Sequence, residues 1–186
     1  MAQHPFLPLF YQLVEQGDSV MELTQFIEGQ TLYDVIREIG LLSTTDCQFY
    51  AACMILLLEY FLSQEIVVRD LKPDNFIVDE NGYLYLISLG SAKRINDRHR
   101  TSTVIGTPHY MAPEVVLGKE YNEMVGLWAV GVMLYEFMVG ELPFGALTEN
   151  PYEIYEEVIQ GDPKFPRNFK DRRAKKLIET MLSLNP

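Results

Sequence analysis

The sequence predicts an α+β fold in which short strands near the N-terminus are followed by a predominantly helical region. Residues 9–14 and 19–26 have the composition of two strands, joined by the turn-rich residues 15–18. From residue 123 onwards the pattern of apolar residues is helical, over residues 123–139, 152–160 and 171–184. The first of these helices is apolar on nearly every side, so we expect it to be buried at the centre of the helical region.

The middle of the chain mixes both kinds of element. Residues 32–39 are expected to form a short helix that ends at Gly40, and residues 43–46 offer several N-cap side chains for a long apolar helix that runs to about residue 63. Short strands are predicted at residues 66–68, 76–78 and 83–87, and residues 79–82 supply the hairpin turn before the last of them.

Size and composition limit the possible functions. With 186 residues, of which 48% are hydrophobic, the chain is expected to form one domain, or most of one. The net charge of −11 disfavours binding to nucleic acid or to anionic membranes by the chain as a whole, and favours basic partners. Cys47 and Cys53 lack metal-binding spacing and are expected to be buried apolar residues in a reducing compartment.

Targeting signals are also not evident. The longest apolar run, residues 49–58, has ten residues, which is too short to span a membrane. The N-terminus lacks the basic and then apolar layout of a signal peptide. We therefore expect a cytoplasmic protein with no membrane span, and attachment to a cytoskeletal or ciliary assembly is one location consistent with this.

Two motifs carry a family resemblance. Residues 68–75 read Val-Arg-Asp-Leu-Lys-Pro-Asp-Asn, and residues 106–114 read Gly-Thr-Pro-His-Tyr-Met-Ala-Pro-Glu. The first resembles the catalytic loop of eukaryotic protein kinases, and the second resembles their P+1 loop and A-P-E motif. Together with residues 142–145 and 151–157, they resemble the AGC group most closely, and within it the cGMP-dependent protein kinases of protists. The resemblance implies that residues 1–27 are a remnant of the upper lobe and hinge, and that residues 28–186 are the helical lower lobe.

The resemblance assigns roles to the catalytic-loop residues. It implies that Asp70 accepts the proton of a substrate hydroxyl, that Lys72 contacts the transferring phosphate, and that Asn75 holds a metal ion. Thr107 matches the threonine that usually hydrogen-bonds this base and lysine. The alternative is that these groups are kept only for folding, because they also hydrogen-bond one another.

Further residues match regulatory and substrate-binding positions. Thr103 matches the phosphorylation site of the activation loop, and Arg69 and Lys93 match its cationic partners. A phosphothreonine carries a charge of roughly −1.5 to −2 and could be clamped by those two cations. Asp74 and Glu136 match the carboxylates with which AGC kinases recognise arginine in their substrates.

One position contradicts the expectation of an active enzyme. Ser88 stands where kinases carry the Asp of D-F-G, whose carboxylate holds magnesium at the ATP phosphates. A neutral hydroxyl is a poor replacement for a carboxylate at a hard divalent cation. ATP and Mg²⁺ are therefore expected as cofactors only if the protein is active. In that case the backbone from Gln25 to Ile27 would form the hinge, and Ile77 would form the apolar floor beneath adenine.

Other losses point in the same direction. The chain has no G-x-G-x-x-G loop, and its first lysine is Lys72, so no strand lysine precedes the catalytic loop. Thr31 replaces a Glu that helps to hold ribose and a substrate arginine, while Glu114 lacks the arginine that usually pairs with it. The residues that normally form and anchor the regulatory spine are replaced by Val68, Leu89 and Gly126. Losing one preorganised electrostatic group costs about 10²–10³ in rate.

Three hypotheses follow from the sequence. The leading one is a pseudokinase that serves as a scaffold or docking module, with a protein partner, or the rest of the same polypeptide, covering the surface where the upper lobe would sit. The second is a fragment of an active, cyclic-nucleotide-regulated Ser/Thr kinase. The third is ATP binding without transfer, although half of the pocket's roof is not in the chain.

Overall fold

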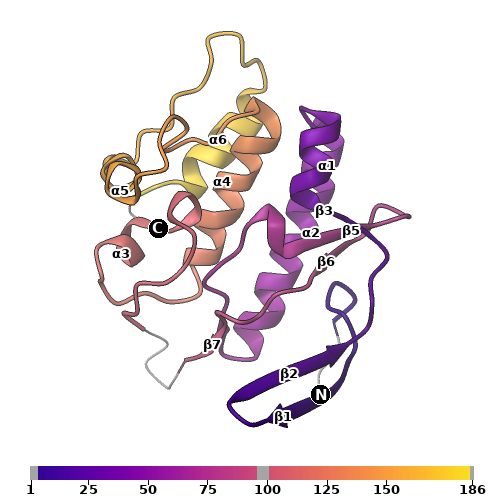
Figure 1. The fold of residues 1–186 in the computed structure, drawn as a ribbon. Helices are drawn as coiled ribbons and strands as arrows, with labels where there is room; N and C mark the ends of the chain where they lie inside the picture. The colour runs from indigo at the N-terminus through magenta and orange to yellow at the C-terminus, as the bar shows by residue number, and fades with distance from the viewer. Residues whose placement is uncertain (1–3, 96–100, 185–186) are drawn as a thin grey trace.

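The computed structural model describes residues 4–95 and 101–184. Its helices are α1 (Leu32–Ile39), α2 (Thr44–Ser63), α3 (Pro113–Val116), α4 (Val125–Val139), α5 (Pro151–Gln160) and α6 (Arg172–Met181), with 3-10 turns at Pro73–Asn75 and Pro108–Tyr110. Its strands are β1 (Phe10–Gln16), β2 (Ser19–Thr24), β3 (Gly29–Thr31), β4 (Ile66–Val67), β5 (Phe76–Asp79), β6 (Leu84–Leu86) and β7 (Lys93–Arg94). The α+β class predicted from the sequence is confirmed, because these strands precede α3 to α6 along the chain (Figure 1).

Helix α4 lies at the centre of the helical region, as its uniformly apolar sequence predicts. Its side chains are buried almost without interruption from Val125 to Phe137, and α2 and α6 pack against it (Figure 1). Trp128 stacks on Phe144, with ring centroids 5.6 Å apart. A Cβ atom on Gly131 would lie 2.8 Å from the Cβ of Met181, so α4 and α6 approach closely at this glycine. Dense packing of this kind makes α4 a rigid support for the loops around it.

The ends of α1 and α2 follow the predicted caps. Gly40, with a φ of 83°, ends α1, and its N–H donates to Ile36 O. Of the predicted N-cap side chains, Ser43 caps α2, because its Oγ accepts a hydrogen bond from Asp46 N at 3.2 Å. Among the described residues, α2 is the one helix with the length and mean hydropathy of a membrane span. This is weak evidence, since α2 packs on α4 and core helices pass the same test.

Two small antiparallel sheets hold the loops next to these helices. The order in the larger sheet is β3-β5-β6, and β4 pairs with β7 in the other. Asp79 makes the predicted turn between β5 and β6, because its Oδ1 accepts from Asn81 N at 3.0 Å and from Tyr83 N at 2.8 Å. The short strands β3 and β7 were not predicted, since their pairing partners are far away in the sequence.

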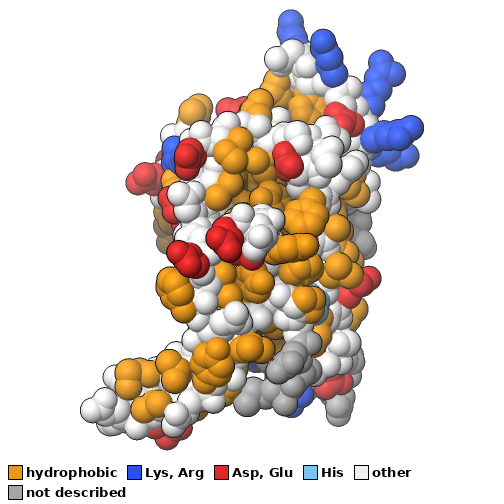
Figure 2. All heavy atoms as spheres, turned by 90° about the vertical axis from the view of Figure 1, so that its right-hand side faces the viewer, with side chains coloured by type: hydrophobic (Ala, Val, Ile, Leu, Met, Phe, Trp, Pro, Cys, Tyr) orange, Lys and Arg blue, Asp and Glu red, His pale blue; other side chains and the backbone are white. Residues whose placement is uncertain are grey.

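The β1–β2 hairpin projects from the rest of the molecule. Every residue of both strands is exposed, and Figure 2 shows hydrophobic side chains along the projecting arm. Tyr11 is 59% exposed, Val20 64% and Leu23 55%. A two-stranded hairpin is marginally stable by itself, and an apolar one needs a covering surface. The predicted boundary at residue 27 follows β2 closely and remains a prediction.

Candidate functional site

The loop between β4 and β5 brings three of the predicted catalytic residues together. Oδ1 of Asp70 accepts hydrogen bonds from Thr107 N at 2.9 Å and from Thr107 Oγ1 at 2.7 Å. The side-chain amide of Asn75 donates to Asp70 O at 2.8 Å and reaches Asp70 Oδ2 at 3.4 Å. The carboxylate is therefore held from both sides, with its orientation fixed before any substrate arrives. Lys72 is half-buried, and its side chain makes no hydrogen bond or ion pair with the described residues.

Gly106 allows the loop before Thr107 to lie directly on the catalytic loop. Its φ is 132°, and a Cβ atom at this position would lie 2.7 Å from Arg69 O. Both facts require glycine, because L side chains rarely adopt this backbone conformation and would collide with the carbonyl. The sequence motif contains Gly106, but its part in bringing Thr107 to Asp70 becomes evident only from this close approach.

The expected magnesium site does not fit the residues present. Ser88 lies after β6 and is half-buried, and its hydroxyl makes no hydrogen bond with the described residues. The nearby candidate ligand Asn75 uses its amide nitrogen on Asp70, which leaves one neutral amide oxygen for a cation. Over the described ranges, no group of three or more His, Cys, Asp or Glu side chains is placed to hold a metal ion. Because Mg²⁺ selects carboxylate oxygens, this donor set is a poor match for it.

The residues expected around a nucleotide lie at the base of the hairpin and in or next to β3 and β5, and their roles remain a prediction. Gln25 N donates to Leu9 O at 2.7 Å, and Gln25 Oε1 accepts from Leu9 N at 3.3 Å, so Gln25 closes the base of the hairpin. Ile77 lies in β5, where it pairs with Thr31 on β3, and Ile27 is half-buried before β3. A cavity of about 320 Å³ lies at the base of the hairpin, but none of the three predicted residues lines it.

Asp74 and Glu136, by contrast, face a common cavity of about 550 Å³. Tyr110 lies between the loop and α4, and its hydroxyl donates to Glu136 Oε2 at 2.8 Å. Burial raises the pKa of the Glu136 carboxyl, and the nearby Asp74 carboxylate raises it further. The hydrogen bond from Tyr110 and the positive charge of Arg37 lower this pKa, but the net shift is upward. Burial and the neighbouring Glu136 also raise the pKa of Tyr110 far above its usual range. The cavity thus contains a desolvated carboxyl whose ionised form would be stabilised by a cation.

Sequence reasoning missed the aromatic and cationic side chains of this cavity. Tyr33 and Arg37 lie one turn apart on α1, and Arg37 Nε and Nη2 donate to Tyr33 Oη at 3.0 Å and 2.5 Å. Both residues line the cavity together with Tyr110. The i, i+4 spacing of Tyr33 and Arg37 was the available signal, because it places both side chains on one face of a helix.

Comparisons with known proteins identify the family of this chain. The family model described as protein kinase domain matches residues 1–186. The chain belongs to the protein kinase domain family. It is 44% identical over 183 residues to a cGMP-dependent protein kinase of Plasmodium berghei. The aligned region is 98% of this chain and 21% of that protein. It is 42% identical over 183 residues to a cGMP-dependent protein kinase of Toxoplasma gondii, with 98% of this chain and 18% of that protein covered.

A cAMP-dependent protein kinase catalytic subunit of Homo sapiens, PRKX, is 37% identical over 179 residues, which are 96% of this chain and 49% of that protein. The kinase domain described here therefore resembles the AGC relatives expected from its motifs. The chain spans only about a fifth of the length of the first two relatives.

The predicted phosphorylation site of this kinase domain has a different local environment from the one expected. Lys93 Nζ donates to Oγ1 of the buried Thr101 at 2.9 Å, and Arg69 Nε donates to Ser91 O at 2.6 Å. Thr103 is exposed, and its carbonyl accepts a hydrogen bond from Tyr121 Oη at 2.6 Å. The clamp of Arg69 and Lys93 on a phosphorylated Thr103 remains a prediction, and it would require Lys93 to leave Thr101.

The residues that we predict to replace the regulatory spine and its anchor differ in exposure. Val68 is buried, whereas Leu89 is 38% exposed. Gly126 is buried, and a Cβ atom there would lie 2.5 Å from Leu58 Cδ2, so Leu58 occupies the space that an Asp side chain would need. The side chain of Glu114 makes no hydrogen bond or ion pair with the described residues.

Thr31 has a role that the sequence comparison did not suggest. It is the N-cap of α1, where its Oγ1 accepts from Asp34 N at 3.1 Å and donates to Asp34 Oδ2 at 2.5 Å. A threonine in this position stabilises the helix locally, which a longer Glu side chain does less well. Thr31 therefore has a structural role that is independent of ribose binding.

Proposed function

We propose that this chain is the degenerate catalytic domain of a pseudokinase, which binds protein partners as a scaffold or docking module and does not transfer phosphate. The observation that carries the proposal is Ser88 at the position of the metal-binding Asp, next to an Asn75 whose amide is engaged by Asp70. Phosphoryl transfer depends almost entirely on positioning and on neutralising phosphate charge. Without a carboxylate ligand for magnesium, neither requirement is met.

The partner would bind on the side of the β1–β2 hairpin. Exposed apolar side chains on both strands, and the cavity of about 320 Å³ at the hairpin's base, present an uncovered surface there. That cavity is lined by Leu7, Phe61, Leu86 and Leu89 among others, so a covering segment would bury mainly apolar area. We propose that either another protein or a further part of the same polypeptide covers it.

The test is Mg²⁺-dependent nucleotide binding by the full-length parent protein, measured by thermal shift, together with transfer of labelled phosphate to a peptide. We expect no stabilisation that requires both ATP and Mg²⁺, and no label on the peptide. Ser88→Asp should increase Mg²⁺-dependent stabilisation by ATP, whereas the control Ser91→Asp, three residues further along, should not. Labelling by the natural protein that disappears in Asp70→Ala would refute the proposal.

A second candidate function is that of an active Ser/Thr kinase of the cGMP-dependent type, of which this chain is a part. It is favoured by the intact hydrogen bonds of Asp70 with Thr107 and Asn75, and by the carboxylate cavity at Glu136. On this alternative, ATP and Mg²⁺ are cofactors, and Glu136 and Asp74 bind a substrate arginine. The same experiment separates the two functions, because only the active enzyme gives label that depends on Asp70.

A further inference from the structure

One short segment carries nearly half of the positive charge of this acidic chain. Residues 164–176 contain seven of the 15 Lys and Arg residues, but only one, Asp171, of the 26 Asp and Glu residues. Figure 2 shows Lys and Arg side chains projecting from one end of the molecule, the end where Figure 1 places the loop before α6. An anionic surface is therefore attracted to this end and repelled by the rest of the chain.

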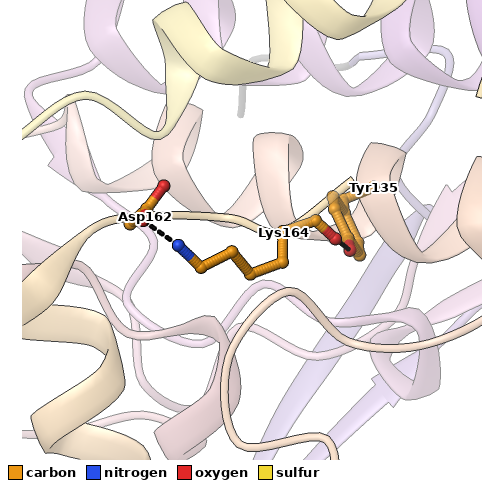
Figure 3. A network of polar contacts seen from close by, with 3 residues as sticks. All are labelled: Tyr135, Asp162 and Lys164. Carbon is orange, nitrogen blue, oxygen red and sulfur yellow. Dashed lines mark hydrogen bonds and ion pairs between the residues drawn. The ribbon is translucent and has the colours of Figure 1, made fainter. Parts of the chain in front are cut away.

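The loop that carries the first of these cations is fixed to the helical core. Tyr135 Oη donates to Lys164 O at 2.6 Å, and Lys164 pairs with Asp162 (Figure 3). The Phe165 ring packs edge-on against Tyr135 with centroids 5.0 Å apart, and Phe169 lies 5.1 Å from Phe165. Because these rings hold the loop on α4, the cations project from a fixed base.

Most of the positive charge in this segment is not paired within the chain. Asp171 caps α6, since its carboxylate accepts from Arg173 N at 3.1 Å and from Ala174 N at 2.9 Å. Lys175 lies 3.7 Å from Glu179, and Lys164 has its own partner. The side chains of the five other cations are exposed and make no hydrogen bond or ion pair with the described residues; they are Arg167, Lys170, Arg172, Arg173 and Lys176.

Two exposed apolar side chains lie beside the basic segment. Thr44 Oγ1 at the start of α2 donates to Asp171 Oδ2 at 3.4 Å, so the chain before α2 adjoins this segment. Leu41 is three residues before Thr44, which places it within about 10 Å. Leu41 is 59% exposed and Ile39 is 65% exposed. This end of the molecule therefore combines unpaired cations with apolar side chains that are free to contact a partner.

The same end stays positive despite the carboxylates near it. Figure 1 shows that α1 ends, α2 begins and α4 ends there, and these helix ends carry Glu38, Asp46 and Glu141. The five unpaired cations outnumber these three carboxylates. The β1–β2 hairpin lies at the opposite end of the molecule (Figure 1). Charges at such a separation are screened, because the Debye length is about 10 Å at 0.1 M salt.

We propose that this end of the molecule docks on a membrane surface that contains anionic phospholipids. The five unpaired cations would lie at the headgroups, and Ile39 and Leu41 would enter the interface, where apolar contact adds to electrostatic attraction. The cations project separately and do not line a groove (Figure 2), which favours a broad surface over a single acidic peptide. The docking surface is distant from the hairpin, so the proposal does not depend on the scaffold function.

The test is co-flotation of the purified chain with vesicles, because bound protein rises with the lipid while aggregated protein sinks. We expect binding to vesicles with about 30% phosphatidylserine at about 0.1 M salt, and none to vesicles of phosphatidylcholine alone. Each Lys or Arg near such a surface contributes about fivefold, so Arg167→Glu combined with Lys170→Glu should weaken binding at least about 25-fold.

The matched control is Arg94→Glu combined with Lys119→Glu, which changes the net charge equally at exposed positions outside the segment. This control should weaken binding much less. Equal losses in the two double variants would mean that net charge alone decides, and would overturn the proposal. Failure to bind the anionic vesicles, or equal binding to both kinds of vesicle, would also overturn it.

A second comparison tests the apolar contact. Leu41→Asn should weaken vesicle binding about fivefold, because less apolar area would leave water. Leu117→Asn is the control, since Leu117 is 46% exposed and lies after α3. No loss in Leu41→Asn would mean a purely electrostatic contact and would overturn the choice of a membrane. If the chain binds an octaglutamate peptide in fluorescence anisotropy but no vesicles, the partner is an acidic protein segment and the proposal fails.

Discussion

The packing of Leu58 against Gly126 shows how α2 fills the space beside a glycine on α4. A Cβ atom on Gly126 would lie 2.5 Å from Leu58 Cδ2 and 3.3 Å from Leu58 Cδ1. We therefore expect Gly126→Asp to lower the free energy of unfolding by about 1–3 kcal/mol, through overpacking and burial of a carboxylate. Adding Leu58→Ala should recover part of the loss, and a double-mutant cycle measured by urea unfolding checks this. Strictly additive effects would contradict the contact.

Thr31 gives a second prediction on single residues. Because its Oγ1 accepts from Asp34 N at the start of α1, Thr31→Ala should lower the free energy of unfolding by about 1 kcal/mol. Thr45→Ala is the control, since Thr45 lies within the first turn of α2, where Ser43 is the cap. Chemical denaturation of both variants makes the comparison, and equal losses would show that Thr31 does not act as a cap.

The raised pKa of Glu136 predicts a dependence of stability on pH. Burial raises this pKa above 4.5, so the folded protein binds the proton more tightly than the unfolded chain does. The stabilisation from protonated Glu136 is complete below pH 4.5 and is lost as the pH rises through the folded-state pKa. Glu136→Gln should therefore gain stability relative to the natural protein as the pH increases from 4.5 to neutrality. Urea midpoints of both proteins across this range test the sign, and parallel curves would contradict it.

At the scale of elements, the segment after residue 100 is joined to the chain before α4. Thr101 and Tyr121 exchange backbone hydrogen bonds at 2.9 Å and 2.8 Å, and Tyr121 Oη donates to Thr103 O at 2.6 Å. Tyr121→Phe removes the last contact alone and should lower the free energy of unfolding by about 0.5–1.5 kcal/mol. Tyr152→Phe, at a position that is 77% exposed, should change it by much less. Equal effects in thermal unfolding would mean that the Tyr121 hydroxyl contributes nothing there.

Long and locally encoded elements were predictable from the sequence. Residues 32–39 were predicted as a helix with these bounds, because Gly40 is a clear stop signal, and α4 was expected to start only two residues earlier than Val125. The strands β3 and β7 could not be predicted, because Gly29 pairs with Asp79 and Lys93 pairs with Val67, and each pair is far apart in the sequence. Elements of two or three residues carry too little pattern to be recognised.

For the whole molecule, the uncovered hairpin predicts concentration-dependent self-association of the isolated chain. Leu13 and Leu23 are 45% and 55% exposed on opposite strands of the hairpin. Replacing both with Glu should shift light-scattering masses towards the monomer, because it interrupts the apolar surface. The control is Leu117→Glu, since Leu117 is 46% exposed and lies after α3. A strictly monomeric natural chain would contradict this prediction.

The candidate site was predictable only where its residues lie close together in the sequence. Asp70 and Asn75 lie five residues apart in one loop, so their proximity follows from local geometry. The contact of Lys93 with Thr101 could not be predicted, because it depends on the path of the chain between them, whose residues 96–100 lie outside the described part. The cavity at Glu136 needed the packing of α1 beside α4 before Tyr33 and Arg37 could be assigned to it.

The position of Leu58 also constrains which side chains position 126 can accept. With a leucine methyl group in the space beside Gly126, an acid introduced at position 126 alone would collide with Leu58. An acid at position 126 would need a smaller side chain at position 58, and that change by itself would leave a void next to α4. Neither single change is favourable, so the residues at positions 58 and 126 can be exchanged at low cost only together.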